Sequence, residues 1–264
     1  MKKRVLSALV LLAIVLTCVL LSEVTRVLFF AAAGILCCYE LSHQLETLQV
    51  YCSAWVMYVY VGSQAVLALI HASPMAYLAS FLGAVYLAML SGVLRKRVSG
   101  NGALDTVAGL GYPAFLFAVL MMIAVSPAWK KVLTLGCLST WACDTFALLG
   151  GIRLGRHKLA PHISPKKSVE GSVCGAVASV VIGALLSFLP YMNGLSPLYC
   201  AVVALIASSL GQLGDLAESM VKRMIGIKDF SNLIPGHGGL FDRADSLLFS
   251  IPAVYVCLYI TKTL

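Results

Sequence analysis

Long runs of apolar residues alternate along the chain with short polar segments. A helix needs about 20 apolar residues to cross the hydrocarbon core of a bilayer, and most of these runs approach that length. Several contain Gly or Pro, which membrane helices tolerate where neighbouring helices satisfy the backbone. The pattern predicts nine membrane-spanning segments, at about residues 5–21, 27–41, 51–70, 75–94, 107–125, 131–150, 172–189, 198–214 and 247–263.

The first run, at 5–21, follows Lys2, Lys3 and Arg4 and so has the basic start of a signal peptide. Its apolar stretch is long, however, and no small-residue cleavage site follows it. We therefore predict that this segment is retained as the first span.

The composition places the protein in the membrane class. Of its 264 residues, 60% are hydrophobic and 11% are charged, whereas a typical soluble domain carries about 25% charged residues. Disorder is excluded, because a disordered chain has low hydrophobicity and high charge. A soluble globular fold could not bury so much apolar surface. We predict an all-α, polytopic integral membrane protein of about nine transmembrane helices.

The basic residues orient the predicted spans. The chain carries 19 Lys and Arg against 11 Asp and Glu, a net charge of +8. With the N-terminus in the cytoplasm, fifteen of the 19 fall on the cytoplasmic side, as the positive-inside rule requires. We predict an N-in, C-out protein of the cell (inner) membrane. Nucleic-acid binding would need a clustered basic patch on a soluble face, and we predict no such partner.

The acidic residues are gathered rather than spread. Seven of the eleven lie in the second half of the chain, all at the predicted inner face of the membrane. Asp144 stands inside an apolar run, where a carboxylate is costly and usually functional. The other six are Glu170, Asp215, Glu218, Asp229, Asp242 and Asp245.

The segment GDLAESMVKR has the spacing of a polar helix face. Asp215, Glu218, Ser219 and Lys222 stand at positions i, i+3, i+4 and i+7, which lie on one side of an α-helix. Because the segment continues the eighth predicted span, we expect this face to point inward or at the membrane interface rather than at lipid.

Asp242 and Asp245 are spaced in the same way, three residues apart at the mouth of the last span. Paired carboxylates of this kind suit Mg²⁺, a hard ion that takes oxygen ligands and often bridges to substrate phosphates. They suit ion pairs with Lys222, Arg223 and Arg243 equally well, and the spacing leaves both interpretations open.

Two loops near these acids suit anion binding. Residues 235–239 read PGHGG; glycines let a backbone approach a ligand closely, and successive amides cradle an anion. His237 alone is more typical of a hydrogen-bonded structural histidine. Residues 153–167 hold five basic residues, which is typical either of a polybasic loop at an anionic membrane surface or of a phosphate clamp.

Together these segments closely resemble the signature of the phosphatidate cytidylyltransferases, or CDP-diacylglycerol synthases. The stretch SMVKRMIGIKDFSNLIPGHGGLFDRADS, at 219–246, matches that signature at its fixed spacing, with Ala244 as a departure. GDLAES, HKLAPHISPKKSVEG and WACDTFA resemble further family segments, so the resemblance covers about residues 141–247. The matching signature residues are Ser219, Lys222, Arg223, Lys228, Asp229, Ser231, Pro235, His237, Gly238, Gly239, Asp242, Arg243 and Asp245.

The resemblance implies an enzyme that transfers CMP from CTP to phosphatidate, giving CDP-diacylglycerol and pyrophosphate for phospholipid synthesis. It implies Mg²⁺ as cofactor, together with a monovalent ion such as K⁺, and a homodimer. Asp215 and Asp242 are the first candidates for metal ligands, with Asp144 and Asp245 in support, and Lys222 and Arg223 are further catalytic candidates. The implied substrate contacts are Lys166, Lys167, Ser168, Ser219, Lys228, His237, Gly238, Gly239 and Arg243.

The predicted topology suits this reaction. CTP is cytoplasmic and phosphatidate lies in the bilayer, so we expect the active site at the cytoplasmic face. We divide the chain into N-terminal spans, 1–130, and a C-terminal catalytic region, 131–264. Two alternatives are an ion-coupled membrane transporter, in which isolated acids inside spans act as relays, and a CTP-dependent polyprenol or lipid kinase-like enzyme, which would lack the complete signature.

Overall fold

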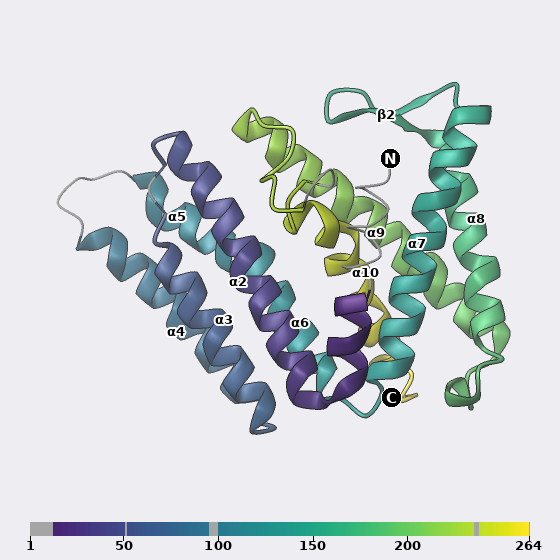
Figure 1. Ribbon diagram of the computed structural model, residues 1–264, viewed down its shortest axis with the longest axis horizontal. Coiled ribbons are helices and arrows are strands. Elements are labelled where there is room, and N and C mark those ends of the chain that lie inside the picture. Colours follow the sequence, from purple (N-terminus) through teal and green to yellow (C-terminus); the bar gives the residue numbers. More distant parts are fainter. Residues whose placement is uncertain (1–12, 51, 95–99, 235–237, 264) are drawn as a thin grey trace. The chain divides into compact units, whose positions relative to one another are not determined.

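In the computed structural model the chain folds into helices and one short β-hairpin (Figure 1). The structure describes residues 13–50, 52–94, 100–234 and 238–263. In this part of the chain, seven helices of 18 to 29 residues are long and apolar enough to cross a membrane. The protein is therefore a multi-pass membrane protein, as predicted.

The seven helices correspond to predicted spans, with shifted ends. The predicted span at 51–70 is the shorter apolar helix α3, Ala54–Leu69. The first predicted span, 5–21, begins outside the described residues, so the count of nine stays a prediction. The seven helices are α2 (Glu23–Thr47), α4 (Pro74–Val93), Gly102–Ala124, α7 (Trp129–Leu154), α8 (Val169–Leu186), α9 (Pro197–Ile225) and α10 (Phe241–Ile260).

The described chain forms two compact units, and each is discontinuous in sequence. Unit 1 comprises Met1–Val125 and Ile227–Arg243. Unit 2 comprises Ser126–Gly226 and Ala244–Leu264. The segment that carries much of the signature is thus grouped with the N-terminal helices, and α10 begins in one unit and continues in the other.

Unit 1 is built around α2, which packs against α3 and α6. The span Gly102–Ala124 is a composite of α5 (Gly100–Gly109), the π-helical turn η1 (Leu110–Ala114) and α6 (Phe115–Ala124). Apolar side chains fill the space between these helices and are completely buried, among them Val27, Met57, Val61, Leu110 and Met121. Because lipid is as apolar as these side chains, such contacts stabilise the unit mainly through van der Waals packing.

Unit 2 is built around the pair α7 and α8, which lie side by side (Figure 1), with α9 packed against both. The expected polybasic loop between α7 and α8 is instead an antiparallel β-hairpin, with β1 at Lys158–Ala160 and β2 at Ser164–Ser168. Helix α8 begins directly after it, because the Ser168 hydroxyl accepts the Gly171 N–H at 3.2 Å and caps the helix. The hairpin is therefore an ordered extension of the helix pair.

Helix α9 continues eleven residues beyond the predicted span at 198–214. The extension is polar, yet Glu218 and Ser219 in it are buried. This confirms that the GDLAESMVKR segment is helical and turns its polar face inward. A prediction from apolar residues alone places the end of this helix too early, because the residues that it buries beyond position 214 include the polar Glu218 and Ser219.

Candidate active site

The predicted site residues fall into two groups, one in each unit. His237, a predicted substrate contact, lies outside the described residues. Unit 2 holds Asp144, Lys166, Lys167, Ser168, Asp215, Ser219, Lys222, Arg223 and Asp245, and unit 1 holds Lys228, Gly238, Gly239, Asp242 and Arg243.

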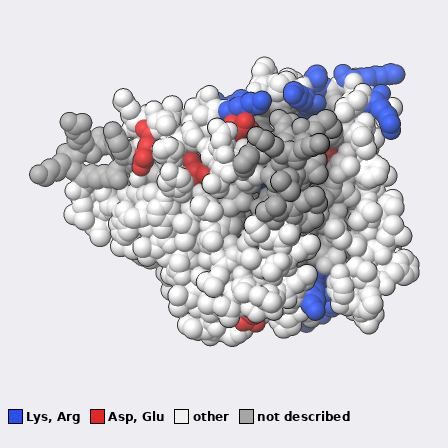
Figure 2. Space-filling view, viewed as in Figure 1, with Lys and Arg blue, Asp and Glu red and all other residues white. Residues whose placement is uncertain are grey.

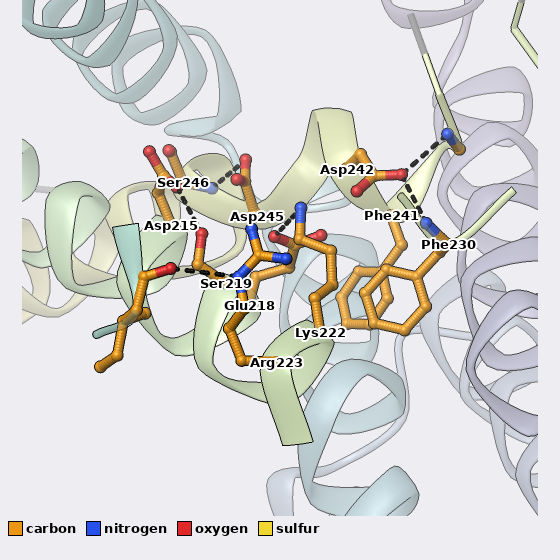
Figure 3. Close-up of polar contacts among 12 residues, drawn as sticks. Asp215, Glu218, Ser219, Lys222, Arg223, Phe230, Phe241, Asp242, Asp245 and Ser246 are labelled. Carbon is orange, nitrogen blue, oxygen red and sulfur yellow. Dashed lines mark hydrogen bonds and ion pairs between the residues drawn. The ribbon is translucent and has the colours of Figure 1, made fainter. Parts of the chain in front are cut away.

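In unit 2, the hairpin reaches α9 through Lys167. Its ammonium group forms an ion pair with Asp215 Oδ2, and the Ser219 hydroxyl lies 3.4 Å from Asp215 Oδ1 (Figure 3). Arg223, two turns further along α9, donates its Nε–H to the Ile163 carbonyl in the hairpin turn at 3.3 Å. These contacts hold a cationic strand against the acidic end of α9.

The two lysines of β2 face different surroundings. Lys167 is half-buried against Asp215, whereas Lys166 is exposed, because successive side chains of a strand point to opposite faces. Arg153, Arg156 and Lys158 are exposed as well. Figure 2 shows Lys and Arg side chains gathered over the hairpin, at the upper right of the view. The hairpin thus places Lys167 beside Asp215, while Lys158 and Lys166 of its strands stay exposed.

The Asp245 carboxyl group of unit 2 feels the charges of two other aspartates. The charges of Asp215, Asp144 and Lys222 all act on the Asp245 carboxyl group, whose Oδ1 accepts the Ser246 N–H at 2.7 Å (Figure 3). Like charges at close range repel, and a cation between them relieves that repulsion. The arrangement therefore favours the binding of a cation.

The carboxylates of unit 2 fit the way in which proteins usually bind Mg²⁺. Among the described residues, no three His, Cys, Asp or Glu side chains lie close enough together to hold one metal ion. Mg²⁺, however, is usually bound by one or two carboxylates, with water and substrate phosphates as the remaining ligands. Asp215 and Asp245 suit that mode, in which the site is completed only when substrate is bound.

Lys222 is paired with Glu218, an acid of the predicted polar face that was not among the predicted site residues. The two side chains stand one turn apart on α9, with Lys222 Nζ 2.6 Å from Glu218 Oε2. Glu218 is completely buried and the Lys222 side chain is 11% exposed. A buried ion pair contributes little net stability, but this one holds the lysine ammonium group beside Glu218. Its place on the same helix face as Asp215 was the signal that could have identified it.

A glycine allows α9 and α10 to approach closely next to Asp215 and Asp245. A Cβ atom on Gly214 would lie 2.6 Å from the Asp245 backbone oxygen and 2.7 Å from the Phe249 ring. No side chain fits there without displacing backbone. The approach of the two helices, and with it the proximity of the two carboxylates, therefore depends on glycine at this position.

We expect Gly214→Ala to destabilise unit 2, whereas Gly211→Ala should be tolerated. Overpacking of this kind costs about 1–3 kcal/mol. Gly211 is the matched control, because it lies on the same helix three residues earlier and its Cβ would meet neighbours only at 3.4 Å or more. Thermal unfolding of the purified proteins in detergent measures the difference. Equal unfolding midpoints for the two variants would contradict the close-approach argument.

In unit 1, Asp242 organises the segment that precedes it. Its Oδ2 accepts the N–H groups of Phe230, at 3.0 Å, and of Gly239, at 2.8 Å (Figure 3). The residue is 5% exposed, in the first turn of α10. One carboxylate oxygen therefore ties together two points of the chain nine residues apart. The expected role of Asp242 as a metal ligand stays a prediction.

A second carboxylate, Glu40 of α2, also contacts this segment and was missed by the sequence analysis. It is 3% exposed and hydrogen-bonds to Ser231, Leu240 and Phe241. The signal was present, because an acid within an apolar run is costly in a membrane helix. The same signal had identified Asp144.

The fold and these charged clusters define a multi-pass helical membrane protein. The model of the cytidylyltransferase family matches residues 2–261, and the chain belongs to that family. This confirms the resemblance inferred from the signature.

Phosphatidate cytidylyltransferases are among its relatives. The protein of Bacillus subtilis (strain 168) is 41% identical over 122 residues, which cover 46% of this chain and 45% of that protein. The protein of Staphylococcus aureus (strain COL) is 43% identical over 122 residues, 46% of each chain. The protein of Rickettsia bellii (strain RML369-C) is 35% identical over 143 residues, which cover 52% of this chain and 62% of that protein. The chain spans about half the length of the curated relatives it matches.

Proposed function

We propose that the protein transfers CMP from CTP to phosphatidate, producing CDP-diacylglycerol and pyrophosphate. A phosphate oxygen of phosphatidate attacks the α-phosphorus of CTP. The bond from the α-phosphorus to the oxygen that bridges to the β-phosphorus breaks, and pyrophosphate leaves with that oxygen. The observation that carries the proposal is the family match over residues 2–261, supported by relatives that bear the name of this activity.

The basic residues of unit 2 suit a reaction between two anions. Both substrates carry negative phosphates, so their approach requires positive side chains placed in advance. Lys167 lies against Asp215, Lys222 is oriented by Glu218, and Arg223 is attached to the hairpin turn. We assign these three side chains to phosphate binding. Each of the three has a defined partner that keeps it in the site.

We propose that Asp215 and Asp245 hold Mg²⁺, with Asp144 as a further nearby charge. When bound, Mg²⁺ supplies charge neutralisation on the phosphates and stabilises pyrophosphate as the leaving group. The Ser219 hydroxyl, beside Asp215 Oδ1, orients that carboxylate. No protein nucleophile is required, because the attacking group belongs to phosphatidate.

We also propose that the site faces the cytoplasm, in a protein with nine spans, N-in and C-out, in the cell (inner) membrane. Unit 2 carries basic residues at the end of α7 and in the hairpin that follows it, where Lys167 pairs with Asp215: Arg153, Arg156, Lys158, Lys166 and Lys167. Basic residues at membrane ends favour the cytoplasmic side. CTP is available on that side.

One experiment tests both the reaction and the orientation. Sealed inside-out and right-side-out vesicles containing the expressed protein are given labelled CTP, phosphatidate, Mg²⁺ and K⁺. Inside-out vesicles should form lipid-linked CMP and release pyrophosphate, whereas right-side-out vesicles should do so only after permeabilisation. Vesicles from cells without the expressed chain are the control.

Each arm has a distinct negative outcome. Absence of lipid-linked CMP from permeabilised vesicles and from the detergent-purified protein, across several phosphatidates, would reject the reaction. Equal rates in both sealed preparations would reject the orientation alone. A CTP-dependent lipid kinase would instead release CDP and form a phosphorylated lipid without CMP, so the products separate the two enzymes.

A further inference from the structure

Glu40 is a buried carboxylate in the N-terminal half of the chain, where the family signature contributes no residues. It lies on the apolar helix α2 and is 3% exposed. A charged group in such a helix is costly unless hydrogen-bonding partners compensate for it. Its partners therefore indicate why the helix carries it.

Glu40 accepts hydrogen bonds from three residues of the segment Ser231–Phe241. Glu40 Oε1 accepts the Ser231 hydroxyl, at 2.6 Å, and the Leu240 N–H, at 3.0 Å. Glu40 Oε2 accepts the Phe241 N–H at 2.8 Å. Hydrogen bonds to an ionised carboxylate are about twice as strong as neutral ones. One side chain of α2 thus fixes both ends of the segment.

Gln44 extends this contact by one helical turn. Its side-chain N–H donates to the Phe230 carbonyl at 2.6 Å, next to the Phe230 N–H that Asp242 accepts. The Phe230 and Phe241 rings pack with their centroids 4.7 Å apart. Glu40 and Gln44 of α2 therefore hold this part of the chain, and Asp242 joins Phe230 to Gly239 within it.

Gly239 of the signature fits directly against the Glu40 carboxylate. A Cβ atom at this position would lie 2.7 Å from both Glu40 oxygens. A side chain here would displace the carboxylate from the hydrogen bonds that it makes. The close contact thus connects a signature position to a residue about two hundred positions earlier in the sequence.

The Glu40 carboxylate also occupies the N-terminal end of α10. The first N–H groups of a helix have no partner within the helix and carry partial positive charge. At α10 the N–H groups of Leu240 and Phe241 donate to Glu40. Asp242 follows immediately, so its position depends on how the helix start is held.

We propose that Glu40 is a positioning residue for the reaction: from α2 it fixes the start of α10 and thereby the placement of Gly238, Gly239 and Asp242. The inference rests on the proposed function. It assigns a role in catalysis to a helix of the N-terminal half.

The test compares Glu40→Gln with Glu46→Gln. The Gln variant keeps the size of the side chain but removes its charge, and it turns an N–H₂ group toward one of the backbone donors. Glu46 is the matched control because it is an exposed glutamate on the same helix. We expect kcat of Glu40→Gln to fall roughly 10- to 100-fold with little change in KM for CTP, and Glu46→Gln to match wild type.

Hydrogen exchange measured by mass spectrometry gives a readout independent of activity. Peptides covering residues 238–245 should exchange faster in Glu40→Gln, while peptides from α7 and α8 should not change. Gln44→Ala, which loosens only the Phe230 contact, serves as the milder variant if Glu40→Gln does not fold. Faster exchange around Phe230 together with a reduced kcat in this variant supports the proposal.

Three results would overturn the inference. The first is a wild-type kcat in the folded Glu40→Gln protein. The second is unchanged hydrogen exchange at residues 238–245. The third is a lower unfolding temperature together with a wild-type kcat at a temperature at which the variant is folded. The last would indicate a purely structural role. If the wild-type protein itself forms no lipid-linked CMP, the proposed function fails, and the exchange result alone still decides whether Glu40 holds the segment.

Discussion

Replacing Asp215 with asparagine is expected to lower kcat by about 100- to 1000-fold while leaving the fold intact. The substitution keeps the shape of the side chain but removes the charge that pairs with Lys167 and acts on Asp245. If Mg²⁺ binds here, the apparent affinity for Mg²⁺ should fall as well. Pyrophosphate release over a series of Mg²⁺ concentrations measures both effects.

A control separates a charge effect at the site from a general loss of charge. Glu23→Gln removes a negative charge from α2, where Glu23 forms an exposed pair with His71 at 3.1 Å, and should leave the rate unchanged. Circular dichroism and the thermal unfolding midpoint should show that both variants are folded. A folded Asp215→Asn protein with the wild-type rate and Mg²⁺ dependence would remove Asp215 from the metal site.

At Asp242, asparagine and alanine are expected to differ in structure while both reduce the rate. Asn retains an oxygen that accepts the Phe230 and Gly239 N–H groups, whereas Ala leaves both buried donors without an acceptor. We expect both variants to lose about 100-fold or more in kcat. Only Asp242→Ala should also increase hydrogen exchange at Phe230 and Gly239.

The pattern of the two measurements assigns the role of Asp242. A rate loss in Asn without faster exchange would indicate that the negative charge itself acts in the reaction. A rate loss confined to Ala, together with faster exchange, would restrict Asp242 to holding the segment. If Asp242→Ala retains wild-type exchange, the two hydrogen bonds do not determine the segment's structure.

Much of the fold could be predicted because membrane spans are local in sequence. Each apolar run must satisfy its backbone within a helix, so the runs at 75–94 and 131–150 correspond to α4 and α7. The hairpin and the extension of α9 could not be found in this way. Both depend on polar contacts, such as that of Lys167 with Asp215 and that of Arg223 with the Ile163 carbonyl.

The candidate site was predictable in its residues but not in their pairing. Helical spacing placed Asp215, Glu218, Ser219 and Lys222 on one face, and α9 confirms this. Spacing alone left metal binding and ion pairing open. The structure shows that ion pairs form, between Lys222 and Glu218 and between Lys167 and Asp215.

The sequence by itself determined the membrane class, most of the spans and the family, because hydropathy and a motif with fixed gaps are properties of neighbouring residues. Only the tertiary structure decided that residues 227–243 are grouped with the N-terminal helices and that Glu40 binds the backbone at the start of α10. Such contacts join residues about 200 positions apart. They arise from the packing of whole helices against one another, and this packing cannot be predicted from the spacing of residues along the chain.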